Sequence, residues 1–181
     1  MSALDSVRRR RSHAAVSADA PSHDELLPLV AAAATVADHA ALHPWRLIEL
    51  RGAARERLGA AFVEASGLTG AEAEKLAAKP LRASLLLAVV ARHVPSFKVP
   101  EWEQDAAASG VAHTLSLLLD EAGWGVMWRT GGLVRSEPVR RVHGLGDDEK
   151  LLGWLYVGGV IPERVKPERD AVDPTDYVSV L

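Results

Sequence analysis

The feature that most constrains the fold is a near-continuous apolar run, SLLLAVVA, at residues 84–91. The run has the length of a strand, and a strand that is apolar at successive positions must be covered on both of its faces. We therefore expect an interior strand of a sheet that carries helices on both sides. Residues 101–122 predict the longest helix, whose apolar side chains lie on several sides and indicate burial in a core or an interface.

The remaining elements are predicted from caps, turns and hydrophobic periodicity. Ser2 with Asp5, Ser22 with Glu25 and Thr69 with Glu72 are helix-capping pairs, the last of them opening a short helix that ends at Pro80. Further helices are expected at 53–66 and 136–143, and strands at 46–50, 124–129 and 151–158. This order predicts an α+β fold with a central, mostly antiparallel sheet flanked by helices. We expect one domain over 1–181, with 161–181 an extended tail that packs on another surface.

Composition excludes several classes of protein. With 181 residues, 48% of them hydrophobic, the chain is typical of a globular domain. It has no run of about 18 apolar residues, so no membrane span is expected, and its basic start lacks the apolar stretch of a secretory signal. Cysteine is absent, which is compatible with the cytoplasm, the location that we expect. A net charge of -3 argues against a general nucleic-acid coat.

The common catalytic motifs are also missing. No phosphate-binding loop, dinucleotide fingerprint or nucleophile elbow is present. His39 and His43 have the spacing of a helical metal pair, but Pro44 disfavours helical angles at the preceding residue, so no metal site is predicted. Trp45 and Trp102 are interpreted as core aromatics.

The run Arg8-Arg9-Arg10-Arg11-Ser12 is the first feature that points to a ligand. It has three interpretations: a solvated basic helix end, an arm that contacts nucleic acid, and an anion clamp. In the clamp, guanidinium groups bind a phosphate in bidentate fashion and the serine hydroxyl adds a further contact. The run alone does not choose among them.

Other segments favour the clamp. The Arg-Arg-Ser start, the loop from Ala37-Asp38-His39 to Pro44-Trp45, and the segments Lys98-Val99-Pro100, Trp102-Glu103-Gln104 and Trp128-Arg129-Thr130-Gly131 follow one another along almost the whole chain. Together they resemble the nitroreductase family of flavin-dependent NAD(P)H oxidoreductases, in particular its small branch. The domain length and the long C-terminal tail agree with that branch.

The resemblance implies an intertwined homodimer with FMN at the subunit interface and the tail 161–181 packed on the partner subunit. Carried over by position, Arg10, Arg11 and Ser12 would hold the FMN phosphate and ribityl chain. His39 would approach the isoalloxazine from the other subunit. Trp128, Arg129 and Thr130 would line the flavin, with Arg129 as the cation beside the N1/C2=O edge.

One position departs from the small branch. Thr35, which the resemblance also assigns to the cofactor site, stands where an arginine is expected, four residues before His39. The loss of one charged hydrogen bond costs about 1.5–3 kcal/mol, so FMN affinity is expected to be lower.

The activity implied is hydride transfer from NAD(P)H, through bound FMN, to an electron-poor acceptor such as a nitroaromatic or a quinone. The cofactor carries the difficult chemistry, so no side chain is assigned as a catalytic acid or base. The alternative is a non-catalytic dimer that binds or sequesters flavin. A protein that contacts nucleic acid through the four arginines ranks third.

Overall fold

The computed structural model describes residues 2–164 and 172–181, and its core is one four-stranded sheet. The strands are β1 (Trp45–Leu50), β2 (Leu85–Arg92), β3 (Trp124–Arg129) and β4 (Glu149–Gly159), and their spatial order is β1-β2-β4-β3. All three neighbouring pairs are antiparallel. The α+β prediction is therefore confirmed, and the apolar run forms the interior strand β2, buried from Leu85 to Ala91.

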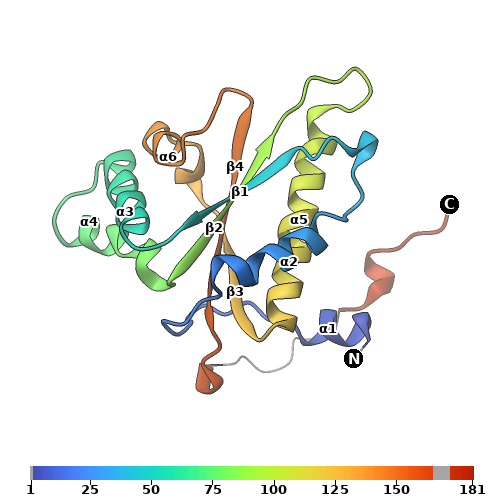
Figure 1. The fold of residues 1–181 in the computed structure, drawn as a ribbon, viewed down its shortest axis with the longest axis horizontal. Coiled ribbons are helices and arrows are strands. Elements are labelled where there is room, and N and C mark those ends of the chain that lie inside the picture. Colours follow the sequence, from blue (N-terminus) through green and yellow to red (C-terminus); the bar gives the residue numbers. More distant parts are fainter. Residues whose placement is uncertain (1, 165–171) are drawn as a thin grey trace.

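Helices cover both faces of this sheet, as Figure 1 shows. On one face lie α2 (His23–Ala33) and the long α5 (Glu101–Glu121). On the other lie α3 (Ala53–Ser66) and α6 (Glu137–His143), with α4 (Gly70–Ala77) packed against α3. The short α1 (Ala3–Arg9) contacts α5. We call the two sides the α5 face and the α3/α6 face.

The alternation of side chains along each strand divides the core between these faces. In β4, Leu155 and Val157 join the α5-face cluster, whereas Trp154 and Tyr156 join the α3/α6-face cluster. Of the apolar residues of α5, Val111, Leu115 and Leu119 are completely buried on the α5 face. Leu117 and Leu118 are only partly buried. Both faces are thus supplied by the same strands.

Two of the three predicted capping boxes form. The hydroxyls of Ser2 and Ser22 accept from the amides of Asp5 and Glu25, and each acid bonds back to its cap residue. The third prediction was wrong, because Thr69 makes no side-chain cap hydrogen bond. Gly70, directly after it, has a left-handed φ of +59°, so the backbone does not enter α4 along the path that a capping box requires.

The prediction that Trp102 is a core aromatic was also wrong. Trp102 is 69% exposed, whereas Trp45 is partly buried against the α5-face cluster as expected. The buried residues of α5 begin at Gln104 and recur every three or four positions, so they form one side of the helix. Trp102 lies two residues before Gln104, about 200° around the helix, and therefore projects away from the sheet.

The C-terminal segment begins with a 3-10 turn at Pro162–Arg164, and a second turn lies at Pro174–Asp176. Residues 165–171, which the predicted tail includes, lie outside the described part of the chain. Large apolar side chains in 172–181 are strongly exposed: Val172, Tyr177, Val178, Val180 and Leu181. Within residues 2–164 and 172–181, no helix combines the length and the apolarity needed to span a bilayer.

Candidate flavin site

A hollow lies on the α3/α6 face, where the end of β3 meets β4. It has a volume of about 540 Å³. Trp154 and Tyr156 of β4 and Phe62 of α3 give it apolar walls. The segment that leaves β3 closes one side, and the sequence-predicted Trp128, Arg129 and Thr130 all belong to it. A hollow of this size and lining is typical of small-molecule sites.

Three cationic side chains line this pocket: Lys79, Arg82 and Arg129. Arg129 is half-buried, and its guanidinium lies 5.1 Å from the centre of the Tyr156 ring. Burial raises the pKa of the Tyr156 phenol to about 12, so this ring is neutral at physiological pH. The pocket therefore combines neutral aromatic surface with positive charge, a combination suited to a flat ligand that carries negative charge.

Two buried side-chain nitrogens at the end of β3 lack a partner among the described residues, Nε of Arg129 and Nε1 of Trp128. The ring of Trp128 lies on the α5 face, edge-to-face with His113 at 5.0 Å between ring centres, so of the two only Arg129 has its donor on the pocket side. Buried donors are normally satisfied, so each unsatisfied one calls for an explanation. Another nitrogen of Arg129, Nη2, donates to the carbonyl of Ala14 at 3.1 Å. An acceptor-bearing ligand in the pocket would account for the unpartnered Nε of Arg129.

Gly153 makes the close packing at this site possible. It has a φ of +130°, and a Cβ there would lie 2.5 Å from the carbonyl oxygen of Arg129 and 2.8 Å from Nε1 of Trp128. Any larger residue would push the 128–130 segment away from β4. This glycine was not identified from the sequence, because its role depends on the pairing of the distant strands β3 and β4.

The basic N-terminal segment runs beside the same strand. The amide of His13 donates to the carbonyl of Val126, in the middle of β3, at 2.9 Å. The stretch that directly follows Arg10, Arg11 and Ser12 therefore contacts β3, whereas these three residues do not themselves line the pocket. Ser12 is exposed, and Arg10 and Arg11 are partly buried.

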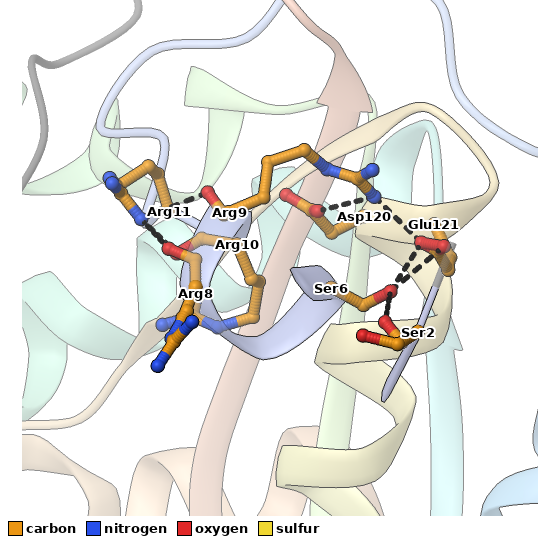
Figure 2. Close-up of polar contacts among 8 residues, drawn as sticks. All are labelled: Ser2, Ser6, Arg8, Arg9, Arg10, Arg11, Asp120 and Glu121. Atoms are coloured by element: carbon orange, nitrogen blue, oxygen red, sulfur yellow. Dashed lines mark hydrogen bonds and ion pairs between the residues drawn. The ribbon is translucent and has the colours of Figure 1, made fainter. Parts of the chain in front are cut away.

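The four arginines do not share one environment (Figure 2). Arg9 turns to the end of α5, where it pairs with Glu121 at 2.6 Å and Asp120 at 3.5 Å. Arg11 turns back and donates to the carbonyls of Arg8, Arg9 and Arg10, capping the C-terminus of α1. Arg9 therefore anchors α1 to α5, a role that the uniform run of arginines did not distinguish.

Thr35 and His39 lie on a different part of the molecule. Thr35 follows α2, and its hydroxyl donates to the carbonyl of Ala32 at 2.8 Å. His39 begins the 3-10 turn His39–Ala41, with Nδ1 2.8 Å from Glu103 Oε2. As Pro44 predicted, residues 39–43 do not form an α-helix, because Ala40, Ala41 and His43 have positive φ angles.

Sequence reasoning missed Lys79, Arg82 and the aromatic walls of the pocket. Lys79 and Arg82 lie in the turn Lys79–Arg82 that precedes β2, and Phe62 lies on α3. Two basic residues on either side of Pro80-Leu81 do not by themselves indicate a binding site. Aromatic residues such as Phe62, Trp154 and Tyr156 are common in ordinary protein cores, so they do not indicate one either. The described residues contain no group of three or more His, Cys, Asp or Glu side chains placed to hold a metal ion.

Comparison with known proteins agrees with this geometry. The model of the nitroreductase family matches residues 7–159. YdjA of Escherichia coli (strain K12), which carries the provisional name of an NAD(P)H nitroreductase, is 30% identical over 183 residues, covering 99% of both chains.

Solved structures show the same fold. A nitroreductase-like family protein from Bacillus cereus superposes with a TM-score of 0.87 at 22% identity, covering 100% of this chain and 96% of its own. The FMN and NADPH-dependent nitroreductase NfnB from Sphigopyxis sp. strain HMH has a TM-score of 0.77 at 19% identity, with 100% and 99% coverage. By its sequence match over most of its length, this chain belongs to the nitroreductase family.

Proposed function

We propose that this protein is an FMN-dependent oxidoreductase that passes hydride from NAD(P)H, through bound FMN, to an electron-poor acceptor such as a nitroaromatic or a quinone. The observation that carries the proposal is the aromatic pocket with three cations at the end of β3, the strand that the chain contacts at His13, directly after the basic segment 10–12. Membership of the nitroreductase family, and relatives named for NAD(P)H and FMN, support it.

The residues present fit FMN. The isoalloxazine is a flat ring system with an apolar face and polar edges, and the pocket offers aromatic walls together with the unpartnered donor of Arg129. In this assignment Trp128, Arg129 and Thr130 line the ring. Lys79, Arg82 and Arg129 supply positive charge that stabilises a negatively charged ring.

Arg10, Arg11 and Ser12 are the proposed phosphate ligands. Guanidinium groups bind phosphate through two parallel charge-assisted hydrogen bonds, which are stronger than bonds to a neutral carbonyl. Arg11 now donates to carbonyls at the end of α1, so binding would exchange neutral acceptors for a dianion. When bound, FMN supplies the hydride chemistry, while these residues fix its position.

The proposed assembly is a homodimer in which Thr35 and His39 reach the flavin held by the partner subunit. Exposed apolar side chains on α1, Leu4 and Val7, and in the tail, Val178 and Val180, are consistent with a surface that a second copy covers. The tail 161–181 is proposed to pack on that copy.

The proposal is tested by titrating the purified protein with FMN and then with NADPH or NADH. We expect a yellow complex that bleaches on reduction and recovers when a quinone is added. A yellow protein that never bleaches would identify the alternative, a dimer that binds flavin without turnover. A colourless protein that takes up no FMN would contradict both.

The phosphate site is tested by Arg10→Ala combined with Arg11→Ala. We expect FMN affinity to fall by more than tenfold, since two charged hydrogen-bond donors are removed. Arg8→Ala is the matched control, because it removes an exposed arginine of the same run that is assigned no ligand. Equal FMN binding by the folded double variant and the control would place the phosphate elsewhere.

A further inference from the structure

The loop that carries His39 has an unusual backbone. Ala40, Ala41 and His43 have φ angles of 63°, 50° and 47°, the left-handed region that residues other than glycine rarely adopt. Three such residues within four positions form a strained segment, and strain of this kind persists only where surrounding contacts enforce it. Backbone strain of this kind is also more frequent at functional sites than elsewhere.

Asp38 makes two of the hydrogen bonds that hold the loop in this conformation. Its side-chain Oδ2 accepts from the amide of His43 at 2.7 Å, and its carbonyl accepts from the amide of Ala41 at 3.0 Å. At the far end of the loop, the carbonyl of Pro44 accepts from the amide of Arg92 on β2 at 2.9 Å. The backbone on either side of the turn is therefore fixed to itself and to the sheet.

The side chain of His39 is held by a different element. Its Nδ1 lies 2.8 Å from Oε2 of Glu103, in the first turn of α5. The side chain of Glu103 is 29% exposed and that of His39 is 55% exposed, so the carboxylate is the more buried of the two groups. A carboxylate is favoured at a helix N-terminus and can only accept a hydrogen bond, so Nδ1 carries a proton.

This contact leaves the other ring nitrogen available. Nε2 of His39 has no hydrogen-bond partner in the described part of the chain, and more than half of the side chain is exposed. In a neutral ring whose Nδ1 is protonated, Nε2 is an acceptor. This nitrogen can therefore accept a hydrogen bond from an N–H or O–H donor of a bound molecule.

We propose that Glu103 is a positioning residue: it fixes the tautomer and orientation of His39 so that Nε2 accepts a hydrogen bond from an N–H of the flavin ring held by the partner subunit. This rests on the proposed function, which brings His39 to the partner's flavin. Oxidised isoalloxazine has a ring N–H, so the chemistry matches. Asp38 and the strained backbone hold the turn, and Glu103 sets the ring.

The first experiment measures FMN dissociation constants of the full-length protein by flavin fluorescence. Glu103→Ala is expected to weaken FMN binding about tenfold, which is the equivalent of one lost hydrogen bond. Glu103→Gln should stay within about twofold of wild type, because its amide oxygen can still accept from Nδ1. Glu101→Ala, which removes the same charge from the same helical turn but pairs with Lys150, is the matched control.

The second experiment asks whether Glu103 acts through His39. His39→Ala and the double variant His39→Ala/Glu103→Ala should bind FMN equally, because a positioning residue contributes nothing once its target is gone. Additive losses in the double variant would overturn the proposal. So would a Glu103→Ala variant that binds FMN as tightly as the Glu101→Ala control.

The third measurement does not need the flavin. Nitrogen-15 NMR of the histidine rings should show His39 with Nδ1 protonated in wild type and in Glu103→Gln, and a mixture of tautomers in Glu103→Ala. An unchanged His39 signal in Glu103→Ala would overturn the role given to Glu103. Wild-type protein that shows this signature but binds no FMN would instead contradict the proposed function, so the two failures are distinguishable.

Discussion

The two faces of the sheet are built from the same strands, but one of them opens into a pocket. On the α5 face Leu115, Leu119 and Val111 are completely buried, and the polar Gln104 and Ser116 of the same helix are buried as well. The α3/α6 face also buries polar groups, among them His143 and Glu149, and it contains the hollow described above. We therefore expect the α5 face to contribute most to stability, and the hollow of the α3/α6 face is the proposed site.

The polar groups of the α3/α6 face are paired. Glu149 accepts from Nε and Nη2 of Arg46, at 2.5 and 2.8 Å, and from the amide of Gly146 at 3.0 Å. These bonds, with that to Arg46 the strongest, hold the pKa of the Glu149 carboxyl below its usual range. His143 donates from Nδ1 to the carbonyl of Val139 and accepts from Nε1 of Trp154 at 3.0 Å.

The largest effect on stability is expected from the α5 face. Leu115→Ala should reduce the free energy of unfolding by about 3–5 kcal/mol, since it removes a completely buried side chain and leaves a cavity. Leu117→Ala, at a partly exposed position of the same helix, should cost about 1 kcal/mol. Chemical denaturation measures both. Equal losses in the two variants would contradict the division of α5 into a buried and an outer side.

A somewhat smaller loss is expected where the two faces meet. Gly153→Ala should destabilise the protein by about 2–4 kcal/mol and weaken FMN binding, because its Cβ collides with the backbone of Arg129 at a positive φ. Gly132→Ala is the control: it lies in the same pocket wall, with nothing within 4 Å of its Cβ. Denaturation and flavin titration should separate them, and identical behaviour would contradict the close packing described above.

His143 should make the α3/α6 face sensitive to pH. Burial lowers the pKa of His143 from an ordinary value of 6.5, so the unfolded chain binds its proton first as pH falls. Stability contributed by the neutral ring is complete above about pH 6.5 and decreases as pH falls below it. His143→Gln should cost about 1–3 kcal/mol at pH 7.5 and flatten this decrease. Denaturation between pH 7.5 and 5 checks the slope; an unchanged slope would mean that His143 does not contribute.

The smallest effect on stability is expected from Arg129, although its effect on binding is large. Arg129→Gln should change the free energy of unfolding by less than about 1 kcal/mol, since the side chain is only half-buried, but should reduce FMN affinity about 10–100-fold. Arg135→Gln, an exposed arginine just beyond the pocket, is the control. If Arg129→Gln strongly destabilises the protein but leaves the FMN affinity of the folded fraction equal to that of Arg135→Gln, Arg129 belongs to the core and not to the site.

Much of the architecture was predictable because its signals are local. The caps at Ser2 and Ser22, the apolar run of β2 and the glycine after α3 act within a few residues of themselves, and their elements lie where they were expected. The two wrong predictions also have local causes. The positive φ of Gly70 prevents Thr69 from capping α4. Trp102 lies on the side of α5 that faces away from the sheet and is therefore exposed, although its residue type suggested a core position.

The site divides in the same way. The sequence prediction of the cofactor residues came from short motifs that resemble those of the family, and it names Arg10, Arg11, Ser12, Thr35, His39, Trp128, Arg129 and Thr130. Only the tertiary structure showed that Arg9 forms an ion pair with Glu121 and that Glu103 contacts His39. It also showed that Lys79 and Arg82, in the turn before β2, line the pocket. The physical reason is that residue type and spacing determine which elements form, whereas a pocket depends on which distant side chains the antiparallel sheet brings together.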